Sequence, residues 1–284
     1  MAYGGGAFAI LFEGDSVKAF DLARNEARTI KAEAPQGEGW ANGYVHLSDP
    51  QLEEILSNGQ LKQRRPIARG EQSGELWEMT LDTTRLRGVF KDVEVTNGDQ
   101  PRRYQHEVAA YLLDRRINLN MVPVTVIRSV DGKQGALRVL VESAVDLVSI
   151  RSYEGLEGRE REETVQRVSE RYGLNLDKLR EQVYRTRLFD ALIGKRNRDD
   201  EDKLLLPTEG RILLVDHEEA FPIMTAIDFM VPVACKILDA DLELSLETLN
   251  RTELEAELGP YLSGQQIEAI LERRDKIFDQ CAQE

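Results

Sequence analysis

The chain of 284 residues has little cysteine and little histidine. Its two cysteines, Cys235 and Cys281, exclude a disulfide framework and a zinc site built from cysteines. The three histidines, His46, His106 and His217, are scattered and lack the spacing of metal ligands. We therefore expect neither a disulfide-stabilised scaffold nor a metal centre made of histidine and cysteine.

Long apolar runs and excess positive charge are also missing. No stretch approaches the ~20 apolar residues that a membrane-spanning helix needs. The N-terminal segment has no basic region and is interrupted by Glu13 and Asp15, which argues against a signal peptide. The net charge of -14 disfavours nucleic acid and anionic membrane surfaces as partners. These absences predict a cytoplasmic protein with no transmembrane segment and no nucleic-acid partner.

What is present is an ordered series of secondary-structure signals. Residues 1–55 are predicted to be an N-terminal extension, with a hairpin and a short helix that Ser48 can cap. Residues 56–145 contain apolar strands, one embedded helix and a hairpin with Asp131-Gly132 at its turn. Residues 146–284 are mainly helical apart from two short strands. The pattern is typical of an α+β protein.

Two residues of the middle region have a spacing suited to phosphate binding. Lys91 ends an apolar strand in "GVFKDVE", and Glu107 lies sixteen residues later on the next predicted helix. A strand lysine held by a helix glutamate can bind the phosphates of ATP, although a surface lysine is the common alternative. Gly70 and Gly74 precede a strand, where their amides could cover phosphates or simply form a turn.

Two acids beside the short strands of the last region predict a metal site. Asp216 directly follows the apolar strand "ILLV", and Asp202 lies just before "LLL". Carboxylates at the ends of adjacent strands can bind Mg²⁺, whereas the alternative is that Asp216 only caps a turn. Asp190 lies on a mostly apolar helix face, and we interpret it as an acid that braces the following loop.

The stretch "LFDALIGKRNRDDEDKLLL", followed by "ILLVDHEEAF", resembles the catalytic core of the atypical kinases that include the Golgi casein kinase family. The HipA toxins and the phosphatidylinositol 3/4-kinase-like bacterial proteins are related to that family. The segments "YQHEVAAYLLDRRINLNMVPVTVIR" and "LSGQQIEAILERRDKIFDQ" also resemble the bacterial branch. The resemblance covers residues 55–280 and implies a two-lobed protein-kinase-like fold, with a β-rich N-lobe around one helix and a mainly helical C-lobe.

This resemblance implies ATP with Mg²⁺ or Mn²⁺ as cofactors, and roles for individual residues. Lys91 would bind phosphate, and Glu107 would hold the lysine. The segment 140–144 would be the hinge beside the adenine, so Val141 and Glu142 are expected to contact the nucleotide.

The same resemblance assigns metal binding to Asp202 and Asp216, and it matches Arg198 to the arginine after the catalytic aspartate. Where the family has that aspartate, this chain has Asn197. An amide can orient a hydroxyl group, but it cannot accept the proton of that group at neutral pH. Asp199 lies two residues further on, and we hypothesise from its proximity alone that it serves as a substitute base.

Lys195 and Arg196 add positive charge where the family has asparagine and a neutral residue. They could attract an anionic substrate or stabilise a transferred phosphate. We favour the interpretation that they pair with the acids at 199–201.

The sequence thus predicts an ATP- and metal-binding kinase-like phosphotransferase with an altered catalytic loop. The alternative is a pseudokinase, which binds nucleotide without turnover and acts as a binding or scaffolding module. A third possibility is a plain α+β interaction protein, which requires four ordered motifs to be chance. The acceptor (protein, lipid or small molecule), the role of residues 1–55 and the oligomeric state stay open.

Overall fold

A computed structural model describes most of the chain. The described residues are 8–13, 16–21, 26–30, 47–66, 75–81, 84–95, 102–141, 144–146, 161–196, 198, 203–206, 210–227, 238 and 240–282. Among their helices, none is both long and apolar enough to cross a membrane.

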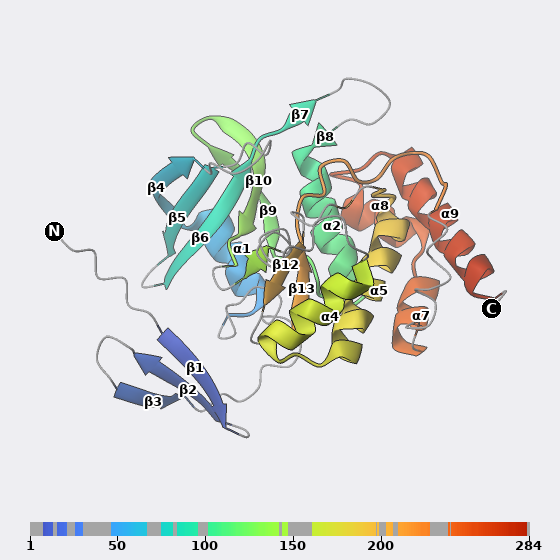
Figure 1. The fold of residues 1–284 in the computed structure, drawn as a ribbon. Coiled ribbons are helices and arrows are strands. Elements are labelled where there is room, and N and C mark those ends of the chain that lie inside the picture. Colours follow the sequence, from blue (N-terminus) through green and yellow to red (C-terminus); the bar gives the residue numbers. More distant parts are fainter. Residues whose placement is uncertain are drawn as a thin grey trace.

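The first lobe is built on a five-stranded antiparallel sheet in the order β4-β5-β6-β10-β9 (Figure 1). Cross-strand pairs join Lys91 to Ala136 and Val89 to Arg138, so these side chains share one face of the sheet. The strands are β4 (Gln60–Pro66), β5 (Glu75–Leu81), β6 (Thr84–Lys91), β9 (Thr125–Val130) and β10 (Lys133–Val139).

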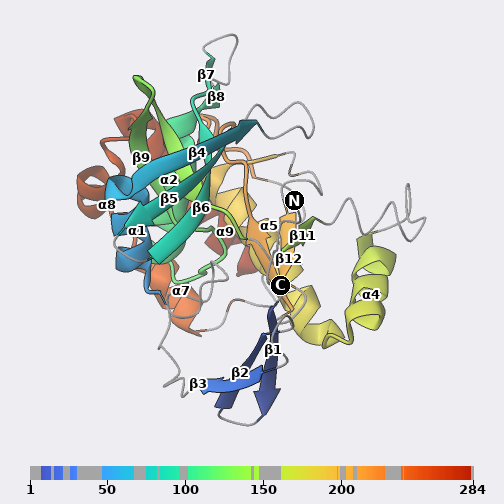
Figure 2. The ribbon, with the colours of Figure 1, turned by 90° about the vertical axis from the view of Figure 1, so that its left-hand side faces the viewer.

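Two helices, α1 (Asp49–Asn58) and α2 (Tyr104–Arg116), pack against this sheet (Figure 2). The start of α1 is a capping box, in which the backbone N–H of Ser48 donates to Oε1 of Gln51 at 2.8 Å. The helix ends before Gly59, as its sequence signals predict. The predicted boundary at residue 55 therefore lies inside α1.

Two smaller sheets belong to the first half of the chain. The predicted N-terminal hairpin is present and continues into a third strand, whereas β7 and β8 form a two-stranded ribbon before α2. The strands are β1 (Phe8–Glu13), β2 (Ser16–Asp21), β3 (Glu26–Ile30), β7 (Glu94–Val95) and β8 (Arg102–Arg103).

The second lobe is mainly helical, and α5 packs against both α9 and strand β13 (Figure 1). A short antiparallel sheet, β11-β12-β13, includes the predicted strand pair near Asp216. The elements are α4 (Arg161–Tyr172), α5 (Leu176–Ile193), α7 (Ala240–Glu247), α8 (Arg251–Leu258), α9 (Gly264–Cys281), β11 (Val145–Asp146), β12 (Lys203–Leu206) and β13 (Arg211–Leu214). The predicted α+β architecture of two lobes is confirmed.

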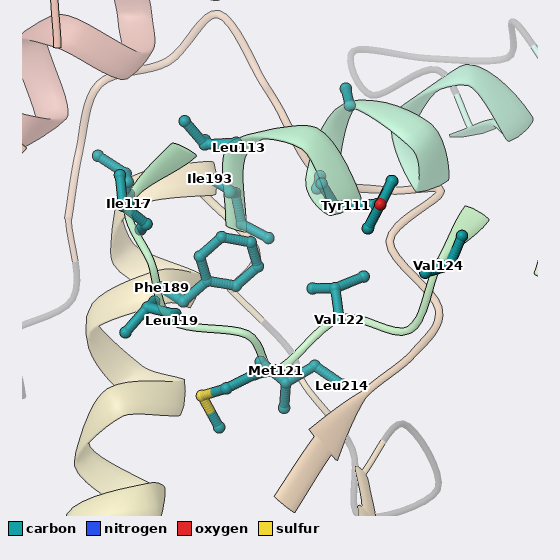
Figure 3. Close-up of a cluster of buried hydrophobic side chains, with 14 of the residues drawn as sticks. Tyr111, Leu113, Ile117, Leu119, Met121, Val122, Val124, Phe189, Ile193 and Leu214 are labelled. Carbon is teal, nitrogen blue, oxygen red and sulfur yellow. The ribbon is translucent and has the colours of Figure 1, made fainter. Parts of the chain in front are cut away.

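The two lobes share an apolar core, in which side chains from α2, the segment after it, α5 and β13 meet (Figure 3). Its labelled members are Tyr111, Leu113, Ile117, Leu119, Met121, Val122, Val124, Phe189, Ile193 and Leu214. The backbone N–H of Leu214 also donates to the carbonyl of Met121 at 2.9 Å. The strand that leads to Asp216 is therefore tied directly to the segment that follows α2.

A buried aspartate holds the turn after α2. The carboxylate of Asp114 is fully buried and accepts hydrogen bonds from the backbone N–H groups of Met121, at 2.9 Å, and Val122, at 3.2 Å. Burial raises the pKa of Asp114, and the charge of Arg115 and these hydrogen bonds oppose the rise. The turn is thus fixed by a side chain that satisfies otherwise buried backbone donors.

Candidate functional site

Lys91 is the last residue of β6, and its ammonium group lies among carboxylates from both lobes. Its Nζ is 3.1 Å from Oε1 of Glu107 on α2 and 2.6 Å from Oδ1 of Asp216, beyond β13. A third carboxylate, that of Glu218, has Oε2 at 3.6 Å. All four side chains are at most 10% exposed. The structure thus brings the sequence-predicted residues Lys91, Glu107 and Asp216 into one buried cluster.

The charges of this cluster stabilise one another. Burial lowers the pKa of Lys91, but the three carboxylates outweigh burial and raise it above its ordinary value. Burial likewise raises the pKa of Glu107, yet Lys91 and a hydrogen bond from His217 bring it well below its usual range. The pKa of Asp216 is also lowered, because Lys91 outweighs burial. The lysine and both acids therefore carry their charges at neutral pH.

The backbone at Asp216 adopts an uncommon conformation. Its φ is 65°, in the left-handed region that non-glycine residues seldom occupy and that often marks functional sites. Its backbone carbonyl accepts a hydrogen bond of 2.6 Å from Nζ of buried Lys195. Lys195 was expected to pair with the acids at 199–201, which lie outside the described residues. Lysines from both lobes therefore converge on Asp216.

The loop that begins after α5 is held by an ion pair. Gly194 ends the helix with φ 70°, and a Cβ there would lie 2.8 Å from the ring of Pro222. Arg198 donates from Nε to Oδ1 of Asp190 at 2.8 Å and from Nη1 to the carbonyl of Val215 at 2.8 Å. Asp190 and Arg198 thus join the end of α5 to the strand before Asp216, in line with the bracing role predicted for Asp190.

Glu218 was not among the predicted site residues. Carboxylate oxygens of Glu107, Asp216 and Glu218 all lie within 4.8 Å of one another. Such an all-oxygen donor set suits Mg²⁺ or Mn²⁺ and therefore fits the metal predicted from the sequence. The available signal was the position of Glu218 two residues beyond Asp216 in "VDHEE".

Two buried histidines support these acids. His217 lies with Nδ1 3.3 Å from Oε2 of Glu107, and His106 Nδ1 lies 2.8 Å from the carbonyl of Glu218. Since Nε2 of His106 faces the amide of Gln266 at 3.2 Å, the Nδ1–H tautomer satisfies both contacts. Burial lowers the pKa of each histidine to about 4, so both are neutral at pH 7.

Arg138 is a further cation near the site, and the sequence patterns did not reveal it. The strand register places it on the same sheet face as Lys91, two residue pairs away. Burial lowers its pKa, against the opposing charges of Glu107 and Asp216. Its Nη1 donates a long hydrogen bond of 3.4 Å to the carbonyl of Val139. Only the pairing of β6 with β10 could have identified this residue.

The remaining predicted site residues divide into two groups. Val141 is buried and packs against Leu213 and Ala144 where the hinge was expected. Six further predictions lie outside the described residues, and their roles stay predictions: Gly70, Gly74, Glu142, Asn197, Asp199 and Asp202.

Comparison with known proteins gives similarity at the level of structure. No family model matches the chain, and no curated protein matches its sequence. The structure of hydra Fam20 with sugar is similar, with TM-score 0.58 and 16% identity over 82% of this chain and 88% of that one. A Golgi casein kinase with Mn/ADP bound has TM-score 0.54 and 15% identity over 82% and 75%. The Helicobacter pylori proinflammatory kinase CtkA has TM-score 0.51 and 12% identity over 79% and 94%.

The fold is kinase-like. At these identities the similarity shows the fold alone. Within it, α2 carries Glu107, β6 carries Lys91, and the segment after β13 carries Asp216.

Proposed function

We propose that this chain binds ATP with Mg²⁺ or Mn²⁺ and transfers a phosphoryl group from it. One observation carries the proposal: Lys91 of the first lobe contacts both Glu107 and Asp216, in a buried cluster to which each lobe contributes. A lysine so placed can bind the α- and β-phosphates, while the glutamate on α2 holds it in position.

Asp216 and Glu218 are the described residues best suited to hold the metal, and Asp202, the other ligand predicted from the sequence, stays a prediction. The metal, when bound, supplies charge that offsets the phosphates. The structural similarity to a Golgi casein kinase solved with Mn/ADP supports this assignment. Two further cations, Lys195 and Arg138, lie near Asp216 and favour an anionic ligand.

The altered loop limits the rate that we expect. Because Asn197 cannot accept a proton, it cannot supply the general-base assistance that is worth ~10²–10⁴-fold. Positioning and charge stabilisation supply most of the catalysis in phosphoryl transfer, so slow turnover remains compatible with this loop. Asn197 also favours the second candidate, a pseudokinase that binds nucleotide and acts as a binding module.

Thermal unfolding with ATP, with and without Mg²⁺ or Mn²⁺, tests the binding. We expect ATP with metal to raise the melting temperature of the wild-type protein, because binding to the native state stabilises it. Lys91→Met should abolish the increase, whereas Lys133→Met, which removes an exposed lysine, should retain it. The absence of any increase at millimolar nucleotide would rule out both candidate functions.

Transfer of radiolabelled phosphate, to the chain itself or to protein, lipid and small-molecule acceptors, separates the two candidates. If the site is a slow phosphotransferase, Asn197→Asp should raise the rate by ~10²–10⁴-fold. Nucleotide binding without transfer in either form would favour the pseudokinase.

A further inference from the structure

Helix α1, most of which lies in the extension to which the sequence assigned no role, contacts α2 through two polar pairs. The hydroxyl of Tyr111 donates to Oε1 of Glu53 at 2.6 Å. Nε of Arg115 donates to Oδ2 of Asp49 at 2.5 Å, and the guanidinium lies 4.7 Å from the centre of the Tyr111 ring. Acids of α1 thus hold two neighbouring side chains of α2.

The residues that α1 holds belong to the same stripe of α2 as Glu107. Glu107, Tyr111 and Arg115 are spaced by four residues, so each lies about one turn beyond the last on one side of the helix. Glu107 and Tyr111 are almost fully buried, and the Arg115 side chain is 15% exposed. The stripe that directs Glu107 to Lys91 is therefore the stripe that α1 contacts.

Helix α1 is itself fixed to the sheet that carries Lys91. Leu52 and Leu56 are fully buried in the core that α1 forms with the sheet. Arg128 of β9 donates to the backbone carbonyls of Leu56 and Gly59 at the end of the helix. Because α1 is fixed to the sheet, its contacts with α2 add to the direct packing of α2 on β9 and β10 in placing that helix.

The ends of α2 are held by other contacts. At the N-terminal end, the backbone N–H of Arg103 and Nδ1 of His106 both bind the carbonyl of Glu218, at 3.0 and 2.8 Å. At the C-terminal end, Asp114 binds the turn at Met121. The contacts with Glu218 join α2 to the second lobe, whereas α1 adds to the contacts of α2 with the sheet of the first.

We propose that Glu53 and Asp49 are positioning residues for the nucleotide site. Through Tyr111 and Arg115 they hold α2 where Glu107 contacts Lys91. The inference rests on the proposed function for its nucleotide readout, but it also makes a prediction for the protein without nucleotide.

The first test measures the Kd for ATP in the presence of Mg²⁺. Glu53→Gln and Tyr111→Phe should each raise the Kd about five- to tenfold, the range expected for one hydrogen bond that orients a charged group. Glu54→Gln is the matched control, because Glu54 is exposed on the same helix and the change in charge is identical. If these two variants unfold more readily but bind ATP with wild-type Kd, the acids of α1 have only a structural role and the inference is wrong.

The second test is a double-mutant cycle in denaturant unfolding without nucleotide. Glu53→Gln combined with Glu107→Gln should deviate from additivity by at least about fivefold in the unfolding equilibrium constant. The control cycle, Glu54→Gln with Glu107→Gln, should stay within about twofold, as expected for independent sites. Additivity in both cycles would overturn the inference even if ATP binds. A wild-type protein that binds no ATP would instead overturn the proposed function, while the cycle would still decide the role of α1.

Discussion

Lys91 and Arg273 are both buried cations surrounded by oxygen atoms, but the oxygen atoms differ in charge. Lys91 lies within 4 Å of three carboxylates. Arg273, on α9, is fully buried and donates to three backbone carbonyls: Leu192 at 2.8 Å, Pro222 at 2.9 Å and Met224 at 2.8 Å. One cation thus has an excess of negative charge around it, and the other has neutral dipoles.

The pKa values of the two groups move in opposite directions for this reason. Burial lowers both, yet the carboxylates around Lys91 outweigh burial and raise its pKa. For Arg273 burial prevails and lowers the pKa to about 10, since only Glu272 opposes it. A buried charge is therefore not in itself a sign of function. An excess of opposite charge around it is the better indication, because such a cluster gains from a further cation such as a metal.

Arg273 has a supporting role that its neutral partners explain. It joins the C-terminal end of α5 to the segment 222–224, which follows the acids at Asp216 and Glu218. Lys276, one turn further along α9, binds Thr225, the residue that follows this segment. The last helix therefore fixes the chain on either side of the site without contributing a charge to it.

The comparison predicts its largest effect at Arg273. Arg273→Leu should lower the free energy of unfolding by about 3–5 kcal/mol, because three carbonyls, two of them buried, lose their donor. Arg273→Lys keeps the charge but has fewer donors, so its stability should lie between that of the wild type and that of Arg273→Leu. Arg251→Leu is the control: its side chain is 56% exposed and its ion pairs lie at the surface, so it should lose much less stability than Arg273→Leu. If denaturant unfolding showed that Arg273→Leu and Arg251→Leu lose similar amounts of stability, the supporting role of Arg273 would be contradicted.

Acid should weaken the cluster around Lys91 through its histidines. The pKa values of His106 and His217 are about 4 in the folded protein, against 6.5 in the unfolded chain. Between these values the unfolded state binds more protons, so stability is fully present above pH 6.5 and falls as the pH drops to 4. Each histidine should cost up to about 1.4 kcal/mol per pH unit in this window.

The measurement is the free energy of unfolding as a function of pH. His106→Gln, which keeps a donor and an acceptor without a titrating group, should reduce the slope between pH 6.5 and 4 and leave the contribution of His217. Arg273 does not titrate in this range, so Arg273→Lys should lower the whole curve without changing its slope. An equal slope in wild type and His106→Gln would show that His106 is not buried in the neutral form.

Gly194 offers a smaller test of how the end of α5 is joined to the segment 222–224, because a side chain at Gly194 would meet both Pro222 and Arg273. Gly194→Ala places a methyl group 2.8 Å from Pro222 and requires a left-handed backbone, so we expect a loss of about 2–3 kcal/mol. Gly173→Ala is the matched control, since its φ is 63° and nothing lies within 4 Å. It should lose only about 1–2 kcal/mol, from the backbone alone. Equal losses in thermal or denaturant unfolding would show that Pro222 yields to the methyl group.

Local signals explain what could be predicted from the sequence. The Ser48 cap, the Asp131-Gly132 turn and the apolar strand before Asp216 each involve neighbours along the chain, and all three occur as expected. Lys91 and Glu107 are further apart, but a strand followed by a helix brings such residues together in a recurring way. For these elements the pattern and the tertiary structure agree.

The unpredicted parts of the site depend on contacts without a local signal. Arg273 reaches the carbonyl of Leu192, 81 residues earlier in the chain, and its helical spacing does not distinguish it from a surface arginine. Arg138 reaches the site only through strand register. Lys195 had acids nearby in sequence, which favoured a local pair that stays a prediction, and its contact with the carbonyl of Asp216 was not predicted. Glu218 differs, since it lies two residues from Asp216 and could have been named.

The smallest change in stability, and the one that sharpens the comparison most, is expected at Glu218. Glu218→Gln keeps the shape of the side chain and leaves Lys91 with two carboxylates. The lost attraction between Glu218 and Lys91 is offset, because Glu107 and Asp216 no longer repel a third negative charge. We expect the free energy of unfolding without ligand to change by less than about 1 kcal/mol. The Mg²⁺ concentration needed for ATP to raise the melting temperature should nevertheless increase about tenfold, because a carboxylate ligand becomes a weaker amide. A large loss of stability with an unchanged Mg²⁺ requirement would mean that the carboxylate of Glu218 only supports the fold, as the carbonyls around Arg273 do. The excess negative charge around Lys91 would then not serve to bind a metal.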